Sequence, residues 1–549
     1  MLRRCADGAV EAHGLGDVPT VRRMAADALP KYVRERERTD VRWVWDDTTR
    51  WYPALLRAGV RVARCTDLRL AHALLRRSPL AERSLLASDD AAGWAALAPV
   101  TPGEPALFPL DDPADRLDPL AEHGRQRAVL AASADGRLAL LVAAESSGAL
   151  VAAEMTAAGL PWRADVHERL LIAALGPRPV AGQRPPVLEG LLAQVRAALR
   201  TPDLNADSPG ALLTALRTAG LPVEDTRSWT LEQLDHPAVP PLLEYKKLAR
   251  LHQANGWAWL ATWVRDGRFR PVFVPGGVVT GRWATSGGGA LSVPAQVRAA
   301  AVADEGWRFV VADVAQLEPR VLAAMSGDTS MAEAARSTDL YQGMVDAGVV
   351  ETRAQAKVGI LGAMYGGTRG ESGRMLPRLT RRYPRAVGLV EDAARAGERG
   401  EVVHTLLGRG SPLPSAEWAE RAVDLGEAPD GDAAPRDADR RRRAWGRFTR
   451  NFVVQGTAAE WALCWMADLR NRLWRLGGED RPGGRLEDRP HLVFFLHDEV
   501  VVHAPEHLAE AAADEVRAAA AEAGRLLFGG FPVDFPLDVA VVRSWADAG

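Results

Sequence analysis

The stretch Leu492–Pro505, LVFFLHDEVVVHAP, places two apolar runs on either side of a polar cluster formed by His497, Asp498 and Glu499. Short runs rich in Val and Phe are typical of buried strands, so the pattern predicts a hairpin with the acidic residues at its turn. Carboxylates at the lip of an apolar sheet need compensation, which a divalent metal can provide. A solvated acidic turn without a function is the alternative that this stretch alone leaves open.

A second acidic residue follows another apolar strand. The run Phe309–Ala312 ends in Asp313, and the sequence then enters a predicted helix that carries Gln316, Glu318 and Arg320. An acid at the carboxyl end of a buried strand is often functional, because ligands bind where strands end. A simple helix cap would produce the same pattern.

Two helical stripes carry donors at steps of four residues. Arg353, Lys357, Leu361 and Tyr365 share one face of a predicted helix, where two cations and an aromatic ring could hold a triphosphate and a base. The second stripe is formed by hydrogen-bond donors, namely Arg447, Asn451 and Gln455. Such donors suit contacts to phosphates and base edges. Solvated faces of ordinary amphipathic helices are the alternative for both stripes.

Composition limits the class of protein. The 549 residues should form about three or four domains, and 47% hydrophobic with 25% charged residues is ordinary for a soluble chain. The net charge of −3 shows no global basic excess, so any nucleic-acid surface must be local. Cys5, Cys65 and Cys464 lack metal-ligand spacing, which argues against a zinc site or a disulfide framework and favours a reducing cytoplasm.

No membrane partner is expected. The N-terminal residues lack the apolar region of a signal peptide, and Glu145 interrupts the longest apolar run, near Leu138–Ala153. Residues 1–135 contain no catalytic cluster. From Gly136 the pattern predicts a strand that runs into a helix, followed by further helices to about Trp263.

Taken together and in this order, these segments resemble the family A DNA polymerases, the DNA polymerase I type. Asp313–Arg320 is similar to the first palm motif of that family, and His497–Glu499 to its last palm motif. Supporting matches are Arg353, Lys357, Tyr365 and Gly366 of the fingers helix, Thr280-Gly281-Arg282, Arg382-Tyr383-Pro384, Gly456-Thr457-Ala458-Ala459 after the second stripe, and Trp545. Six motifs in the family's order leave little room for coincidence. The strongest likeness is to the actinobacterial group labelled bifunctional 3′-5′ exonuclease and DNA polymerase.

The resemblance implies a fold of the α/β (α+β) class with the right-hand architecture of palm, fingers and thumb, preceded by a reduced exonuclease-like α/β domain. The implied segments are residues 1–135 for the degenerate 3′-5′ exonuclease-like domain, 136–264 for the thumb and connecting helices, 265–345 for the first part of the palm, 346–446 for the fingers, and 447–549 for the second part of the palm.

The same resemblance implies a DNA-directed DNA polymerase that adds dNTPs to a primer by two-metal phosphoryl transfer. Asp313 and Asp498 would hold two Mg²⁺ ions, with the Val314 carbonyl as a further ligand and Mn²⁺ able to substitute. Arg353 and Lys357 would neutralise the triphosphate. The implied partners are primer-template DNA and dNTPs, and we expect a cytoplasmic, nucleoid-associated monomer.

The remaining candidate residues divide between the nucleotide and the DNA. Glu318 would exclude a ribose 2′-hydroxyl, and His497 and Glu499 would support the primer end. The nucleotide-binding set also includes Gln316, Leu361 and Tyr365. The DNA-binding set is Arg282, Arg447, Asn451, Gln455, His497, Tyr365 and Gly366, partly along the minor groove, where acceptors are shared by all base pairs.

Departures from the family pattern leave two questions open. Leu361 stands where the family has an aromatic ring, which puts sugar selection in doubt. The exonuclease function is not expected, because no strand before residue 60 carries the Asp-x-Glu pair that such sites need. A polymerase-like protein that mainly binds DNA is one alternative function, and a metal-dependent nuclease is another.

Overall fold

The computed structural model describes residues 1–16, 18–98, 116–180, 182–336, 338–367, 370–414, 434–478 and 484–548, with the backbone alone for 434–437. These residues form two compact units. Unit 1 comprises Met1–Ala158, Val272–Ser286 and Gly306–Val541. Unit 2 comprises Gly159–Pro271, Gly287–Glu305 and Val542–Gly549.

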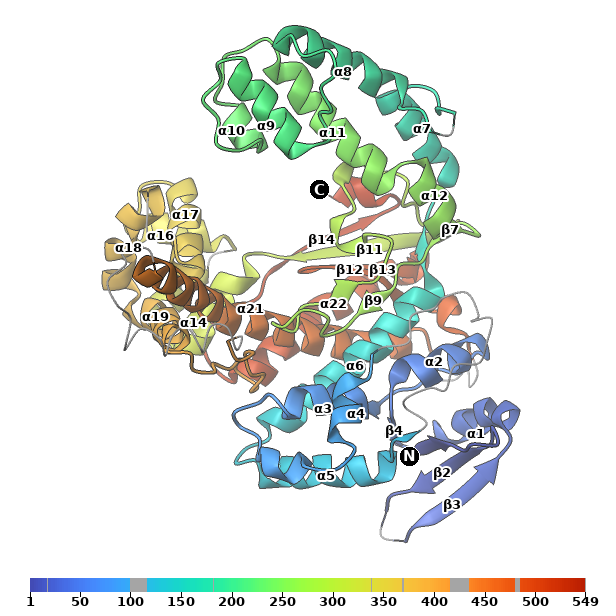
Figure 1. The fold of residues 1–549 in the computed structure, drawn as a ribbon. Coiled ribbons are helices and arrows are strands. Elements are labelled where there is room, and N and C mark those ends of the chain that lie inside the picture. The colour runs from blue at the N-terminus through green and yellow to red at the C-terminus, as the bar shows by residue number, and fades with distance from the viewer. Residues whose placement is uncertain are drawn as a thin grey trace. The chain divides into compact units, whose positions relative to one another are not determined.

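A four-stranded sheet forms the centre of unit 1 (Figure 1). Its strands are β11 (Trp307–Val314), β12 (His491–Leu496), β13 (Glu499–Pro505) and β14 (Leu537–Val542), in the order β12-β13-β11-β14. All residues of β12 are buried, and β12 and β13 pair antiparallel around a turn formed by His497 and Asp498. The predicted hairpin is therefore confirmed, and its apolar runs are buried on both faces.

Long helices pack against this sheet. They are α6 (Arg137–Ala158), α21 (Ala434–Leu476) and α22 (Ala509–Phe528). Helix α22 contacts β11, β13 and α21, and its buried face consists mainly of alanines, which allow close approach. Trp461 of α21 stacks on Phe535 at a centroid distance of 5.0 Å, and the Trp465 indole donates to the Val516 carbonyl at 3.1 Å. Bulky rings from α21 thus fill the space beside the small residues of α22.

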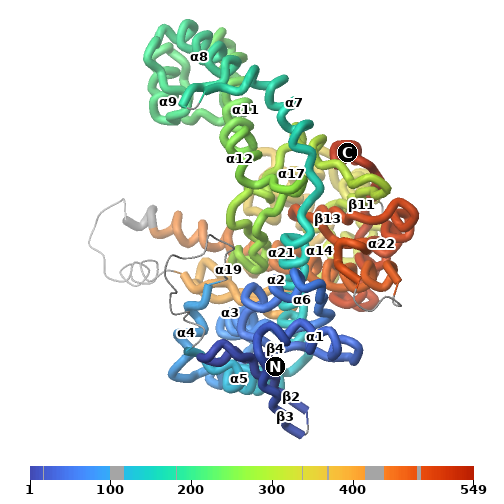
Figure 2. Tube along the Cα trace, turned by 90° about the vertical axis from the view of Figure 1, so that its right-hand side faces the viewer, coloured from blue at the N-terminus to red at the C-terminus, as the bar shows by residue number. Residues whose placement is uncertain are grey.

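The segment from Gly136 corrects the prediction of a strand that enters a helix. It is one helix, α6, because Leu, Ala, Met and Glu favour helix and no Pro interrupts them. Its length and a mean hydropathy of 1.5 would suit a membrane span, but the molecule buries 72% of that window, as a core helix does. Helix α6 lies beside α2 (Thr48–Arg57) and α3 (Leu68–Leu75) of the N-terminal region (Figure 2).

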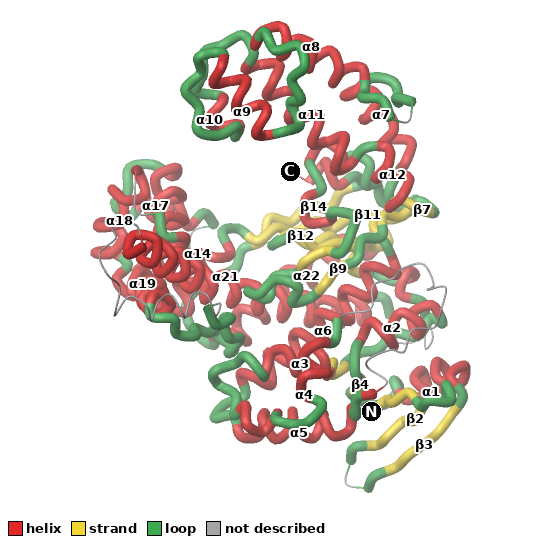
Figure 3. The backbone as a smooth tube through the Cα atoms, in the orientation of Figure 1, coloured by secondary structure: helices red, strands yellow, loops and turns green. Residues whose placement is uncertain are grey.

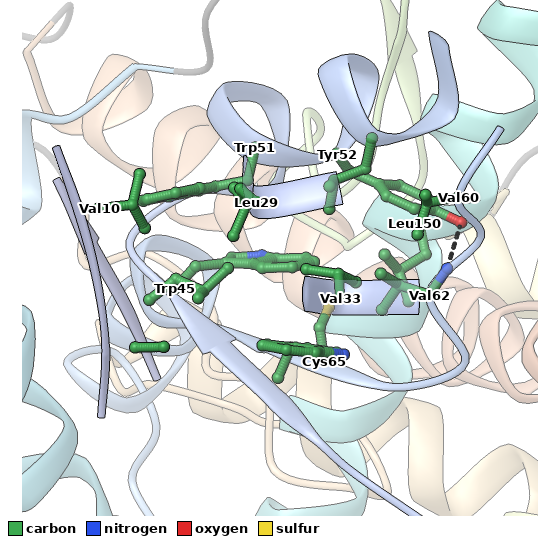
Figure 4. Packing of buried hydrophobic residues seen from close by; sticks show 14 residues of the cluster. Val10, Leu29, Val33, Trp45, Trp51, Tyr52, Val60, Val62, Cys65 and Leu150 are labelled. Atoms are coloured by element: carbon green, nitrogen blue, oxygen red, sulfur yellow. Dashed lines mark hydrogen bonds between the residues drawn. The ribbon is translucent and has the colours of Figure 1, made fainter. Parts of the chain in front are cut away.

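The N-terminal region has an α/β structure. Strands β1 (Leu2–Arg4), β2 (Val10–Gly14) and β3 (Thr20–Met24) form an antiparallel sheet. Strands β4 (Trp43–Trp45) and β5 (Cys65–Asp67), between which α2 lies in the sequence, pair in parallel. The other helices here are α1 (Leu29–Arg36), α4 (Ala91–Ala96) and α5 (Pro119–Ala132). The core is built around Trp45, Tyr52 and Val62, and Leu150 of α6 packs into it (Figure 4).

A buried ion pair connects this N-terminal region to α21. The Arg470 guanidinium donates to Glu154 of α6 and to the carbonyls of Val62 (2.6 Å) and Ala63 (2.7 Å). The Tyr52 hydroxyl donates to Glu154 at 2.6 Å. Burial would raise the pKa of the Glu154 carboxyl, but Arg470 and the second guanidinium, Arg61, bring its pKa below the ordinary value. The charge of Glu154 is therefore compensated within the fold.

Six α-helices lie between β11 and α21 in the described part of the chain, and α17 among them begins and ends at residues typical of helix caps. They are α14 (Leu317–Ser326), α15 (Thr329–Ala335), α16 (Leu340–Asp346), α17 (Arg353–Tyr365), α18 (Gly370–Arg382) and α19 (Pro384–Glu398). The Thr352 hydroxyl caps α17 by accepting from the Gln355 amide at 3.2 Å. Gly366 ends the same helix in the left-handed conformation, with φ of 78°. The predicted helix that carries Arg353, Lys357, Leu361 and Tyr365 is thus confirmed.

Unit 2 is mainly helical (Figure 3). Its elements are β6 (Leu160–Pro161), α7 (Ala164–Leu175), α8 (Pro186–Leu199), α9 (Pro209–Thr218), α10 (Ser228–Leu231), α11 (Val239–Asn255), α12 (Trp257–Trp263), β7 (Val264–Arg265), β8 (Arg268–Phe269) and α13 (Ala295–Arg298). Trp162, Trp259 and Phe269 form an aromatic cluster with centroid distances of 4.8 to 5.6 Å. The short strands β9 (Phe273–Val274) and β10 (Ala284–Thr285) pair within unit 1.

The segment 136–264 for the thumb and connecting helices stays a prediction. Unit 2 starts at Gly159, because α6 packs with the N-terminal region and α21 and so belongs to unit 1. It also runs past residue 264 to Pro271, because β8 pairs with β6 and β7. Pairing between residues distant in the sequence decides both limits.

Candidate active site

Three of the predicted acidic residues lie at one edge of the central sheet. Asp313 at the end of β11 is the antiparallel partner of Glu499 at the start of β13. Asp498 immediately precedes Glu499, and its carbonyl accepts from the Val314 amide at 3.2 Å. Adjacent strands lie about 5 Å apart, so the sheet register brings the two aspartates together. His497 is exposed and occupies the left-handed region, with φ of 60°, at the tip of the turn.

The charge state of Asp498 fits a cation site. Burial raises the pKa of the Asp498 carboxyl, and Glu318 adds to the increase, while His497 and Arg282 oppose it. A desolvated carboxyl of this kind is suited to a divalent cation, which would favour its ionised form.

The carboxylates at this edge are too few for a metal site built from protein ligands alone, but they suit Mg²⁺. Among the described residues, no group of three or more His, Cys, Asp or Glu side chains could hold a metal ion. Mg²⁺ is usually bound by one or two carboxylates, with substrate phosphates and water completing its octahedron. Asp313 and Asp498 supply such a pair of carboxylates, so the residues present fit this ion.

Three further predicted residues are joined by hydrogen bonds. Glu318, in the first turn of α14, accepts from the Arg282 guanidinium and from the Tyr365 hydroxyl at the end of α17. Burial and this hydrogen bond raise the pKa of the Tyr365 hydroxyl, which therefore remains a donor. Glu318 is mostly buried and fixed on both oxygens, so its position next to Asp498 is well defined.

The predicted cations of α17 face solvent, and sequence reasoning missed the partner of one of them. The Arg353 guanidinium donates to Asp339 at 2.5 Å and lies 5.5 Å from the centroid of the Tyr341 ring. Burial alone would raise the pKa of Asp339, but the hydrogen bond from Arg353 contributes to a pKa below the ordinary value. Lys357 is exposed and Leu361 is half-buried on the same helix. The capping position of Asp339 before α16 is readable in the sequence, but its ion pair is not.

Gln316 has a structural role in this state. It stands before α14 with φ of 51°, and its side-chain oxygen accepts from the Leu340 amide at 3.1 Å and from Arg320 at 3.4 Å. Arg320 is fully buried and also donates to the carbonyls of Ala315 and Thr338, both at 2.8 Å. Burial lowers the pKa of Arg320 to about 10. Arg320 therefore fixes the start of α14 through these hydrogen bonds. The predicted contact of Gln316 with a nucleotide stays a prediction.

The second stripe lies on α21 as predicted. Arg447 is exposed, whereas Asn451 and Gln455 are half-buried. The side-chain oxygen of Asn451 is buried and has no hydrogen-bond partner among the described residues. A Cβ on Gly366 would lie 2.7 Å from Cγ of Arg447, so these two predicted DNA-binding residues are in contact.

Other contacts hold α21 against the rest of the site. The buried Arg450 guanidinium donates to the Ala363 carbonyl of α17 at 2.6 Å, a link that the sequence did not reveal. Gly456 packs against the segment before Arg282, since a Cβ there would lie 3.0 Å from the Thr280 carbonyl oxygen. The glycine of the motif after the stripe therefore permits close approach of helix and loop.

The N-terminal region brings three carboxylates to one end of its parallel strands. Asp46 and Asp47 follow β4, and Asp67 ends β5. Asp47 caps α2 and pairs with Arg69 at 2.7 Å. The Asp67 carboxylate accepts from the amides of Thr48 (2.7 Å) and Leu70 (3.0 Å). These two carboxylates are thus engaged by helix caps and an ion pair.

Asp46 is similarly engaged. It accepts from the Trp51 indole and pairs with Arg50 at 3.2 Å, and burial raises the pKa of its carboxyl. Burial and the neighbouring Asp47 raise the pKa of Asp67 to about 7. Arginines and peptide amides take the contacts that metal ions would need.

Comparison with known proteins places these features in a family. The sequence profile of DNA polymerase family A matches residues 197–547. The thermostable DNA polymerase I of Thermus filiformis is 28% identical over 343 residues, which cover 57% of this chain and 37% of that protein. DNA polymerase I of Chloroflexus aurantiacus is 27% identical over 333 residues, covering 56% of this chain and 32% of that protein.

A solved structure agrees in fold. The POL domain of Pol1 from M. smegmatis, in complex with DNA primer-template and dNTP, superposes with a TM-score of 0.61 at 20% identity. The match covers 78% of this chain and 74% of that chain. The predicted palm, fingers and thumb architecture is confirmed by this similarity. Because the family profile covers well over half of the sequence, the chain belongs to DNA polymerase family A.

Proposed function

We propose that this chain is a DNA-directed DNA polymerase, which adds dNTPs to a primer 3′-hydroxyl on a template. The observation that carries the proposal is the sheet register that pairs Asp313 with Glu499 beside Asp498. Membership of family A supports the same activity. The chain spans 37% and 32% of the length of two polymerase relatives that it matches, so the activity is proposed for the portion that they share.

Asp313 and Asp498, with the Val314 carbonyl, would hold two Mg²⁺ ions, and Mn²⁺ would substitute. Bound at this edge, such ions would lower the pKa of the primer hydroxyl and neutralise the triphosphate. Arg353 and Lys357 would bind the phosphates, for which Arg353 must leave Asp339. The exposed position of Arg353 makes that exchange inexpensive, because surface ion pairs are weak.

The other residues would position the substrates. Glu318, held by Arg282 and Tyr365, would stand against a ribose 2′-hydroxyl. Arg447, Asn451, Gln455, His497, Glu499 and Gly366 would contact the primer-template. The half-buried amides on α21 suit the minor groove, whose acceptors do not depend on sequence.

A primer-extension assay tests the function directly. A labelled primer on a template is incubated with Mg²⁺ and one dNTP at a time, and we expect only the nucleotide complementary to the template to be added. DNA binding is measured on the same duplex. Binding without extension in Mg²⁺ or Mn²⁺ would contradict the proposal and leave a DNA-binding module. We further propose that the protein is a monomer, which sedimentation with and without DNA measures. We also propose that it is cytoplasmic and associated with the nucleoid.

Leu361→Phe should strengthen contact with the incoming sugar. Leu361 lies one helical turn before Tyr365 on the exposed face of α17, and an aliphatic chain offers no flat face there. A ring contact is worth about 1 kcal/mol, so we expect a several-fold lower KM for dNTPs and altered use of dideoxynucleotides. Discrimination against ribonucleotides should change less, because it would rest on Glu318. Single-nucleotide insertion kinetics with dNTP, ddNTP and rNTP measure this, and an identical response of all three would place Leu361 away from the sugar.

We also expect no metal-dependent 3′-5′ excision. Asp46, Asp47 and Asp67 are engaged by arginines and helix amides, so these three carboxylates do not form a free pair for two metals. A mismatched, labelled primer incubated with Mg²⁺ and no dNTP should keep its length over many extension half-times. Excision that persists in Asp313→Asn, in which the polymerase site is changed, would reveal an exonuclease site elsewhere.

A further inference from the structure

A cavity of about 600 Å³ in unit 1 is lined by arginines from four segments of the chain. We call it the arginine pocket and define it by Arg34, Arg38, Arg61, Arg64, Arg475 and Arg489. Arg34 belongs to α1 and Arg475 to the end of α21, so the pocket is formed by the N-terminal region together with the palm helix. Its volume is that of a site for a small molecule.

The arginine pocket is distinct from both sites described above. Arg64 immediately precedes β5, whereas Asp47 and Asp67 are at the carboxyl ends of β4 and β5, so the pocket lies at the opposite ends of these parallel strands. Along α21, Arg475 follows Arg447 by 28 residues. At 1.5 Å per residue this is roughly 42 Å, beyond the reach of a ligand at the polymerase site.

Among the described residues that line the pocket, positive charge exceeds negative charge. Six of these residues are arginines and three are acids, and each of the three acids already has a partner. Glu37 accepts from the Trp43 indole at 2.6 Å and the Ala63 amide at 3.1 Å, while Asp40 pairs with Arg64. The third acid, Asp468, pairs at 2.5 Å with Arg472, which does not line the cavity.

Two of the arginines are uncommitted and two are held in place. Arg38 and Arg475 are exposed and have no side-chain partner among the described residues. Arg61 and Arg489 flank the Trp474 ring, with guanidinium carbons 4.9 and 4.0 Å from its centroid. Arg489 is 3% exposed and donates to the Trp474 carbonyl at 2.9 Å. Such fixed guanidinium groups lose little freedom when an anion binds.

Arg61 is a buried cation of the pocket that shares the Glu154 carboxylate with Arg470. Its side chain is 6% exposed, and its Nε is buried without a hydrogen bond, 3.4 Å from Glu154. Burial and the neighbouring Arg470 lower the pKa of Arg61 to about 10, so the surroundings do not fully stabilise its positive form. An anion in the pocket would supply the missing negative charge.

We propose that the arginine pocket binds a compact anion with two or more phosphate groups, such as inorganic pyrophosphate or a nucleoside triphosphate. Six guanidinium groups that converge on one cavity, among them those of the exposed Arg38 and Arg475, match the several oxygens of adjacent phosphates. A strand of nucleic acid is the poorer fit, because the cavity holds a small molecule and the Trp474 ring is covered by guanidinium groups instead of being free to stack on bases.

Calorimetric titration with pyrophosphate and with dATP tests the proposal. The full chain is used in EDTA, so that a metal-dependent polymerase site does not bind the triphosphate, and equal ionic strength is kept with sodium chloride. Arg38→Ser/Arg475→Ser should weaken binding at least tenfold while circular dichroism and melting stay unchanged, because neither side chain is used by the fold. Arg36→Ser/Arg517→Ser removes the same charge outside the pocket and should bind as the unchanged protein does.

The outcomes separate clearly. Binding of either anion that depends on Arg38 and Arg475 supports the proposal. The anion with the lower Kd shows whether the pocket prefers pyrophosphate or a nucleoside triphosphate. No binding of either anion, or equal losses in both double variants, overturns it. Binding of a single-stranded oligonucleotide that requires Arg38 and Arg475, without binding of the small anions, also overturns it. None of these readouts depends on primer extension.

Discussion

Asp498→Asn and Asp313→Asn are each expected to reduce primer extension at least about a thousandfold, while affinity for primer-template stays near that of the unchanged protein. A thousandfold loss is roughly 4 kcal/mol, within the several kcal/mol that a divalent metal contributes to phosphoryl transfer. Asparagine keeps the shape of the side chain but lacks the charge that would hold the cation. The sheet register puts both residues at the same edge, so neither variant should spare the site. Single-turnover extension and DNA binding are measured on the same preparations.

Asp514→Asn is the matched control for these two variants. Asp514 lies on α22, which follows the opposite end of β13, and is exposed, so its replacement removes one carboxylate away from the edge at Asp313. It should extend primers at the rate of the unchanged protein. Extension by Asp498→Asn or Asp313→Asn within about tenfold of that rate would overturn the metal assignment.

Arg470→Met is expected to lower the free energy of unfolding of unit 1 by about 3–5 kcal/mol, because removing one partner of a buried ion pair leaves the other charge uncompensated. The side chain of Arg470 is 2% exposed, and Glu154 keeps only the Tyr52 hydroxyl and Arg61 after the change. The carbonyls of Val62 and Ala63 lose their donor as well. Urea denaturation followed by circular dichroism at pH 7 gives the difference from the shift in midpoint.

Two companion variants test the reason for this loss. Arg525→Met breaks an exposed pair with Glu522 on α22 and should shift the midpoint only slightly. Glu154→Leu combined with Arg470→Met removes both charges and should recover much of the stability, since an apolar pair can replace a buried ion pair. If Arg470→Met is no more harmful than Arg525→Met, the buried pair does not hold the N-terminal region.

The parts of the fold that the sequence predicted are those encoded over short distances. The β12–β13 hairpin, the strand that ends at Asp313 and helix α17 each have a local pattern of apolar residues with a turn or cap beside it. The candidate site could be predicted because the family resemblance joined motifs that are remote in the sequence. The sheet register then brought Asp313, Asp498 and Glu499 to one edge.

The remaining features depend on tertiary contacts. Helix α6 was predicted to begin as a strand, because an apolar run buried on all sides has no helical periodicity to distinguish it. The partner of Arg353 could not be predicted, since Asp339 lies on another helix. The aspartates of the N-terminal region were not recognised as caps and ion-pair partners for the same reason: their arginines are identified only once β4 and β5 are paired.

The link between the N-terminal region and Arg470 also determines when this part of the chain can finish folding on the ribosome. Arg61 donates to the Arg470 carbonyl, a contact that spans 409 residues. At 5–20 residues per second, translation of that interval takes roughly 20–80 s. During this time Glu154 lacks its main countercharge and the carbonyls beside Tyr52 lack their donor. We therefore expect the N-terminal region to complete this buried ion pair only after α21 has been made, and nascent chains that stop before Arg470 to leave that part of the core incomplete.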